Sequence, residues 1–472
     1  MAQFSVRRYL AEFLAVRNVA VNICSLVCAC LLFLAQGCMT YKPLSLNEAG
    51  IANSLTPPDM EVVRMKTKEL RHPILKPIDF DISDGLSADE AAILAVIANP
   101  KLRAARDQRH LADAQLLQAG VLPNPQLAYG LDLPTGGATE GTINAYNFSL
   151  SWDITSLIPR SAKVNAAKAE AASVDLDIAW QEWQMAEAAK LNVYHLDFFD
   201  QTLAVAREEE EGLKDNLDRV NRGAALGFMT RIDVAAADAA VRKMHSLVLS
   251  AEQQREEEQL ALNQALGFPA EQNIPLKKSI APGAVAQLPS AAELIDGLEG
   301  RRLDLLALKS GYQAEEEKLR AAVLAQFPKI NIGFTHARDT TDVITTGFGI
   351  TIDLPLFDRN QGEIAIEDAT RSKLFDEYVA RLFEARAEVG RLVATMGALQ
   401  KQIDAAQQSI PVLQNVVDSY YAALLQGNAD VLTYYNGRSD LTNKRLELLD
   451  LKRQLADASV ALEIAAGRYL EP

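Results

Sequence analysis

Residues 147–154 read Asn-Phe-Ser-Leu-Ser-Trp-Asp-Ile, and residues 347–354 read Gly-Phe-Gly-Ile-Thr-Ile-Asp-Leu. In both stretches a large apolar side chain alternates with a small or polar one. This period of two is typical of a β-strand with one apolar and one polar face. Phe148 and Phe348 lie 200 residues apart, as do Asp153 and Asp353. The two stretches therefore predict equivalent strands in a duplicated chain.

The duplication extends well beyond these strands. Ser87-Ala88-Asp89-Glu90 and Ser290-Ala291-Ala292-Glu293 each have the pattern of a capping box that opens a helix. These two boxes lie 203 residues apart, and a first-half loop three residues longer, around 134–141, accounts for the change of offset. Several ordered matches with a single insertion in a turn indicate a true internal repeat.

Each half predicts the same order of elements: helix, β-hairpin, long helix, turn and helix. We expect repeat 1 at residues 87–266 with its hairpin at about 125–154, and repeat 2 at residues 290–472 with its hairpin at about 328–354. Residues 267–289, rich in proline and turn formers, predict a linker.

The four strands share one design. Each has about nine residues, close to the 9–11 of a tilted membrane strand. A half-buried soluble sheet would alternate in the same way, but the aromatic content of the apolar faces favours a membrane barrel. The residues that we expect to face lipid are Tyr129, Tyr146, Phe148, Leu150, Trp152, Phe334, Phe348, Ile350 and Ile352.

Four strands cannot close a membrane barrel. Open sheet edges are not tolerated in lipid, and the smallest barrels have about eight strands. If these strands lie in a membrane, several chains must share one barrel. This argument allows two or more copies and does not choose three.

The predicted helices are too long for a globular domain. Helical patterns run from about 159 to 222 and from about 360 to 426, and roughly 63 residues would span about 95 Å. The other helices are expected at 87–119, 230–266, 290–326 and 428–468, so that two short helices end to end match one long helix. This arrangement suits the wall of a helical tube. Gly212 and Pro411 occupy nearly equivalent positions, where we expect a belt of irregular structure.

The N-terminus predicts export. Residues 1–37 have the basic start and short apolar run of a signal peptide. Gly37 directly before Cys38 resembles a lipobox, which favours lipidation of Cys38 over an incidental cysteine after an ordinary signal peptide. Residues 38–86, with five prolines, predict an extended, lipid-anchored tail.

Composition and motifs exclude several classes of function. A net charge of −15 makes nucleic acid an unfavourable partner, and is typical of a large solvated surface or of an acidic lumen. The sequence has no phosphate-binding loop, nucleophile elbow or zinc-protease motif. We therefore expect no catalytic residue, no metal site and no cofactor.

The turn motifs carry a family resemblance. Gly427-Asn428-Ala429-Asp430-Val431-Leu432 and its repeat partner beginning at Gly227 lie between the two helices that end each repeat. With the lipobox and the duplicated hairpins, they resemble the TolC-like outer-membrane efflux proteins, over nearly all of the mature chain.

This resemblance implies a mostly α-helical fold with a membrane β-barrel portion. Three chains would build a shared 12-stranded barrel and a long α-helical barrel that extends into the periplasm. The turns would form the periplasmic tip, which narrows the pore and meets the adaptor of an inner-membrane pump. The implied tip and gate residues are Gly227, Asp233, Gly427, Asp430, Thr433 and Asn436.

The resemblance does not extend to an acidic gate ring. Some relatives narrow the pore with an aspartate in the second tip motif, but the positions six and nine after Gly427 are Thr433 and Asn436 here. Asp233 matches a family aspartate, although a role as a helix N-terminal partner is the favoured interpretation.

The sequence therefore predicts a passive exit duct, anchored in the outer membrane, that works with an adaptor and a pump. The alternative is a periplasmic coiled-coil adaptor or scaffold lipoprotein, which would not need two amphipathic hairpins between its helices. Drugs, metal ions and polypeptides all remain open as exported substrates.

Overall fold

The computed structural model describes residues 40–277 and 288–470. The predicted signal peptide and Cys38 lie outside these ranges. Compact contacts divide the chain into two units, one ending at Thr56 and one beginning at Pro57. In the described part of the first unit, helix α2 (Glu48–Ser54) is capped by Asn47, whose side chain accepts a hydrogen bond from the Gly50 amide.

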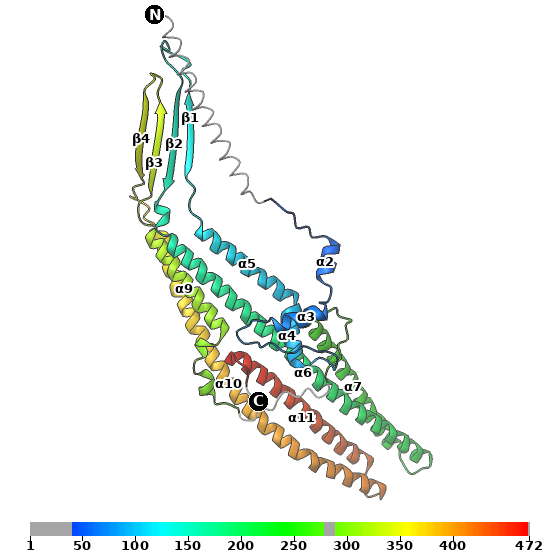
Figure 1. The fold of residues 1–472 in the computed structure, drawn as a ribbon. Helices are drawn as coiled ribbons and strands as arrows, with labels where there is room; N and C mark the ends of the chain where they lie inside the picture. The colour runs from blue at the N-terminus through cyan, green and yellow to red at the C-terminus, as the bar shows by residue number, and fades with distance from the viewer. Residues whose placement is uncertain (1–39, 278–287, 471–472) are drawn as a thin grey trace, which may run out of the picture. The chain divides into compact units, whose positions relative to one another are not determined.

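The second unit confirms the duplicated order of elements (Figure 1). Both repeats supply a helix, a β-hairpin, a helix of more than sixty residues and a returning helix. The first half contains α3 (Met60–Lys68), α4 (Ala88–Ala98), α5 (Pro100–Gly120), β1 (Gln126–Asp132), β2 (Ala145–Asp153), α6 (Arg160–Ala225) and α7 (Arg231–Leu266). The second contains α8 (Ala291–Ile295), α9 (Leu303–Leu324), β3 (Ile330–Arg338), β4 (Ile344–Ile352), α10 (Gln361–Leu425) and α11 (Val431–Ala466).

The four strands form one antiparallel sheet in the order β1-β2-β3-β4. The register places Leu150 opposite both Leu127 and Phe334, and Phe334 opposite Phe348. Directly paired residues share a face of a sheet. All nine residues predicted to face lipid therefore lie on a single face, and the small and polar residues line the other.

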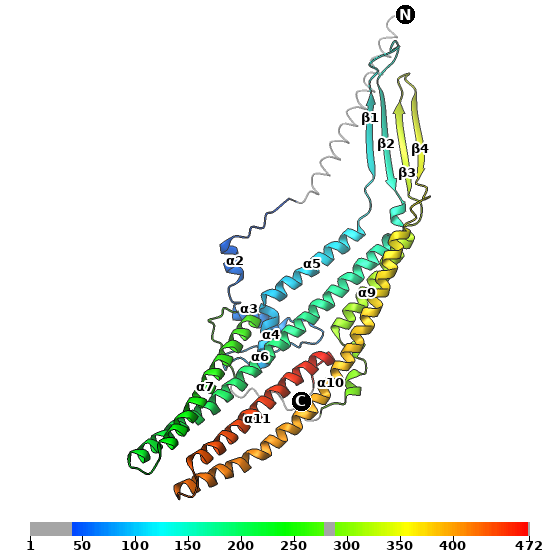
Figure 2. The ribbon, with the colours of Figure 1, turned by 180° about the vertical axis from the view of Figure 1, so that it is seen from behind.

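The helices follow the order of the strands (Figures 1 and 2). Next to the sheet, α5 packs on α6, α6 on α9 and α9 on α10. Farther from the sheet, α7 packs on α6, α6 on α11 and α11 on α10. The sheet lies at one end of this unit and the α6–α7 and α10–α11 turns lie at the other. No helix within the described ranges is both long and apolar enough to cross a membrane.

The apolar core is concentrated where the helices next to the sheet meet those farther from it. Trp183 and Trp180 are buried there beside α4 and the start of α9. A second cluster fills the space among α6, α7, α10 and α11, towards the turns. The sheet contributes no large buried hydrophobic residue.

Two helices that were predicted to be continuous are broken. Helix 87–119 is interrupted at Asn99, because Pro100 disfavours helical backbone at the residue before it and the Asn99 side chain caps the next helix through the Lys101 amide. Helix 290–326 is interrupted between α8 and α9, with a 3₁₀ turn at Leu298–Gly300.

The expected irregular belt at Gly212 and Pro411 was wrong: α6 and α10 run through both positions as unbroken helices. Proline removes one helical hydrogen bond, but packing of α11 along α10 retains the helix. Gly212 has a different role, because a Cβ there would lie only 2.9 Å from a guanidinium nitrogen of Arg438.

Residues 57–86 are not the extended tail that was predicted. They include α3, and Val63, Leu75 and Phe80 are buried against the helices. The His72 ring accepts hydrogen bonds from the Ile74 and Leu75 amides at Nδ1. Proline content indicated extended backbone, but it does not show that apolar side chains between the prolines find partners in the core.

Candidate functional site

The strands at both edges of the sheet have unpaired backbone. Directly after β4, the Asp353 amide donates to the carbonyl of Lys329, the residue before β3. Backbone groups alternate along a strand, so Phe348 and Ile350 of β4 direct their N–H and C=O groups away from β3. The same alternation leaves the backbone of Tyr129 in β1 facing away from β2. Each edge is a template for another strand.

The turns at the far end are tight and capped. Gly227 and Gly427 have φ of 80° and 74°, which are left-handed values that favour glycine. Thr230 and Asp233 form a capping box, with the Thr230 amide 2.7 Å from the Asp233 carboxylate. This contact supports the helix-terminal interpretation of Asp233.

The second turn is capped by a carboxylate too. Asp430 accepts hydrogen bonds from the Thr433 amide at 2.7 Å and from its hydroxyl at 3.0 Å. The hydrogen bond from the Thr433 backbone lowers the pKa of Asp430. Asn436 is exposed on the first turns of α11. The structure thus brings Asp430 and Thr433 together as a cap, while Asn436 lies apart from that pair.

Polar contacts between the two helical hairpins form a seam that the sequence did not reveal. The Arg438 guanidinium of α11 donates to Glu209 of α6 at 2.6 Å, and their side chains are 17% and 13% exposed. Closer to the turns, Arg219 donates to the Tyr421 hydroxyl at 3.2 Å. The seam therefore joins repeat 1 to repeat 2. The feature of the sequence that could have pointed to the seam is Gly212, where the lack of a side chain leaves room for Arg438.

The acidic run Glu208–Glu211 of α6 is only partly exposed to solvent. Glu209 belongs to the seam, and Glu210 is buried, accepting from Lys214 at 2.7 Å and from His245 at 2.9 Å. Glu208 and Glu211 are exposed. Four consecutive glutamates do not show from sequence alone that Glu209 and Glu210 contact cations while Glu208 and Glu211 face solvent.

A charged histidine links three helices above the seam. His195 of α6 contacts Asp457 of α11 at 2.6 Å and Glu258 of α7 at 3.3 Å. Burial lowers the pKa of His195, but hydrogen bonds to Asp457 and Glu258 outweigh it and raise the pKa to about 9. The imidazolium form is therefore the one that holds the three helices together at neutral pH.

Replacing His195 with Gln is expected to reduce thermal stability in a pH-dependent way. Because the folded pKa is raised above 6.5, the stabilisation is fully present below pH 6.5 and is lost as the pH rises through about 9. At its maximum it amounts to up to about 3 kcal/mol. Melting curves of both proteins between pH 6 and pH 10 should converge at high pH, and a constant gap would contradict this. His110→Gln, at an exposed position, is the control.

Within the described ranges, no group of three or more His, Cys, Asp or Glu residues is arranged to hold a metal ion. The geometry instead comprises an apolar sheet face, two free sheet edges, capped turns and a seam between hairpins. Such an arrangement suits a wall of a larger assembly.

Comparison with known proteins identifies the family. The family model of outer membrane efflux proteins matches residues 94–268 and 294–468, one match in each repeat. The chain belongs to the outer membrane efflux protein family. It is an outer-membrane channel, the exit duct of a tripartite efflux system, and it reaches into the periplasm. The family is one of channels and transport proteins.

Individual relatives of this efflux protein are distant in sequence. The cobalt-zinc-cadmium resistance protein CzcC of Cupriavidus metallidurans is 21% identical over 89% of this chain and 98% of its own length. The cation efflux system protein CusC of Escherichia coli K12 is 25% identical over 35% of this chain and 39% of its own length.

The fold of the efflux protein matches solved structures more fully. A crystal structure of CusC covers 84% of this chain and 98% of its own, with a TM-score of 0.69 at 18% identity. The outer membrane protein VceC of Vibrio cholerae covers 81% of this chain and 97% of its own, with the same TM-score and identity.

Proposed function

We propose that three copies of this efflux protein close a 12-stranded barrel in the outer membrane and a helical barrel below it. The observation that supports this proposal is the unpaired backbone at the two edge strands, β1 and β4. Strand order and helix order coincide, so β1 and α5 lie at one edge and β4 and α10 at the other. If β4 and α10 of one copy pair with β1 and α5 of the next, the same rotation relates both the sheets and the helices of neighbouring copies. A closed ring requires that shared rotation.

The tip roles follow from the same assembly. The turns at Gly227 and Gly427 are the periplasmic end, where the pump's adaptor docks. Exposed apolar side chains gather at both turns, including Leu226, Phe228 and Leu425, and such groups favour a protein partner. Asp233, Asp430 and Thr433 hold the turns in shape, and Asn436 lines the opening. Acylated Cys38 anchors the chain in outer-membrane lipid.

The decisive experiment combines stoichiometry and conductance. Detergent-purified protein is cross-linked, its mass is measured by light scattering, and the oligomer is added to a planar bilayer. A trimer with discrete conductance steps is the expected result. A water-soluble monomer without conductance would overturn the proposed shared barrel.

Weakening the seam is expected to open the tip. Glu209→Gln removes the carboxylate charge opposite Arg438 in a mostly buried pair, so the two hairpins separate more readily. We expect single-channel conductance to rise several-fold over the parent. Glu252→Gln is the matched control, because Glu252 pairs with Arg207 at 2.7 Å within repeat 1 at a more exposed site. Equal conductance in both variants would contradict the prediction.

We further propose metal cations as the exported solutes. The names of CzcC and CusC refer to cobalt, zinc, cadmium and cation efflux. A chain with net charge −15 attracts cations to its surfaces. Deletion in the native host should sensitise cells to Co²⁺, Zn²⁺ or Cd²⁺. Unchanged metal tolerance with new sensitivity to organic drugs would assign the duct to drugs instead.

A further inference from the structure

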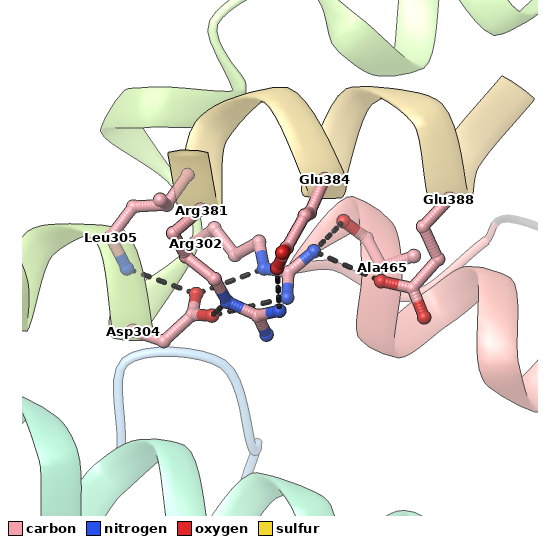
Figure 3. Close-up of polar contacts among 7 residues, drawn as sticks. All are labelled: Arg302, Asp304, Leu305, Arg381, Glu384, Glu388 and Ala465. Carbon is pink, nitrogen blue, oxygen red and sulfur yellow. Dashed lines mark hydrogen bonds and ion pairs between the residues drawn. The ribbon is translucent and has the colours of Figure 1, made fainter. Parts of the chain in front are cut away.

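A buried arginine lies where α9, one of the helices next to the sheet, meets the end of α11, one of the helices nearer the turns. Arg302, the residue before α9, is 1% exposed and is among the largest fully buried side chains (Figure 3). Its guanidinium makes two contacts with Asp304, at 2.9 Å and 3.1 Å, and one with Glu388 of α10 at 3.5 Å. A buried guanidinium requires such neutralising partners.

The same side chain caps the end of α11. Arg302 donates to the Ala465 carbonyl, in the last turn of that helix, at 3.3 Å. A cation is favoured there, because the carbonyls at a helix C-terminus carry partial negative charge. Gly467 lets the chain pass close by, since a Cβ at that position would lie 3.1 Å from the Arg302 Cα. The arginine therefore fastens the sheet-proximal end of α11 to α9 and α10.

A second buried cation holds the same end of α11 from the other side. Lys190 of α6 donates to Glu463 of α11 at 3.0 Å and lies 3.9 Å from Glu187. Burial opposes the charge on Lys190, but Glu187 and Glu463 raise its pKa, so the ammonium form persists. Thus the last turn of α11 is held from α6 by the Lys190–Glu463 ion pair and from the start of α9 by the hydrogen bond of the charged Arg302 to the Ala465 carbonyl.

The equivalent end of α7 has no such ionic clamp in the described structure. Asn99 stands where repeat 2 has Arg302, and its amide donates to the Ala265 carbonyl at 2.8 Å. Asn263 stands where repeat 2 has Glu463, and its amide donates to loop carbonyls such as Gln272. A side chain thus caps the equivalent helix end in each repeat, but it is the neutral Asn99 in repeat 1 and the charged Arg302 in repeat 2.

We infer that Arg302 and Lys190 clamp the sheet-proximal end of α11, so that when the tip opens α11 moves about this fixed end. This inference rests on the proposed trimeric assembly and its periplasmic tip. The side chains of Arg302 and Lys190 are 1% and 10% exposed, whereas the contact nearest the turns, Arg219 with Tyr421, is exposed. Exposed contacts are weak and hydrated, and removing one partner of a buried charge is costly, so the end of the seam nearest the turns yields before the clamp. Arg302 and Lys190 are positioning residues for the gate.

The test uses spin labels on pairs of introduced cysteines, since residues 40–470 contain none. One pair, Leu226 and Gln426, spans the two turns, and the other, Gln184 and Arg468, spans α6 and the clamped end; all four positions are exposed. Labelled chains are diluted with unlabelled chains, and distances within one chain are measured by pulsed electron resonance. Glu209→Gln should lengthen the tip distance by about 2 Å or more and leave the other unchanged.

When Arg302→Met is introduced into the Glu209→Gln chain, the distribution of Gln184–Arg468 distances should broaden. Arg302→Lys, which retains the charge without the planar guanidinium, should broaden it less. Asn99→Ala is the matched control and should leave that distance narrow. A narrow distance in both Arg302 variants would overturn the clamp, and the Lys variant decides if the Met variant does not fold. Because these distances lie within one chain, they report on the clamp even if the parent fails to conduct. Such a failure would count against the proposed trimeric assembly alone.

Discussion

Leu150→Arg is expected to abolish assembly of the channel in the outer membrane. Leu150 lies near the middle of β2 on the apolar face, paired with Leu127 and Phe334. An arginine that faces lipid at the bilayer midplane costs about 2–4 kcal/mol, and the proposed trimer would carry three. The summed cost is comparable with the whole stability of a small domain, about 5–15 kcal/mol.

The adjacent residue offers a stringent control for this substitution. Ser149 lies in the same strand at nearly the same depth, but its side chain is on the polar face with Thr335 and Ala128. Ser149→Arg should insert normally and change only conductance or ion selectivity. Membrane fractionation and heat-resistant trimer on gels measure both variants. Equal tolerance of the two arginines would contradict the assignment of the faces.

Ile350→Pro is expected to prevent trimer formation while leaving the chain's own sheet intact. The Ile350 N–H points away from β3, so the substitution removes no hydrogen bond within the chain. In the proposed ring it deletes a donor to β1 of the next copy at each of three junctions. An unsatisfied backbone group in hydrocarbon costs several kcal/mol.

The readout for this variant is oligomeric mass and conductance, with circular dichroism to show that the strands and helices remain. Ile350→Val retains the N–H and an apolar side chain, so it should assemble as the parent does. A trimeric, conducting Ile350→Pro channel would show that β4 is not a pairing edge. The two predictions are independent, because one concerns a face of the sheet and the other its edge.

The strand faces and the repeat were predictable from the sequence because both are local or periodic properties. Alternation along residues 147–154 determines which side chains share a face wherever the strand lies, since successive residues point to opposite sides. The two long helices and the glycines at 227 and 427 likewise follow from patterns within one continuous stretch of sequence, whereas the breaks at Asn99 and between α8 and α9 were not predicted. The turn motifs and duplicated hairpins resembled the outer-membrane efflux proteins, and the family matches in both repeats confirm that resemblance.

The clamp and the seam were decided only by the tertiary structure. Arg438 and Glu209 are 229 residues apart in the chain, and Arg302 meets the Ala465 carbonyl across 163. No periodicity records which charged residue on one helix faces which on another, because side-chain pairing depends on how the helices pack. For the same reason the sequence did not distinguish a free tail from residues 57–86 packed on the core. Local backbone geometry set the elements of this protein, and packing between distant segments set the contacts that hold its two repeats together.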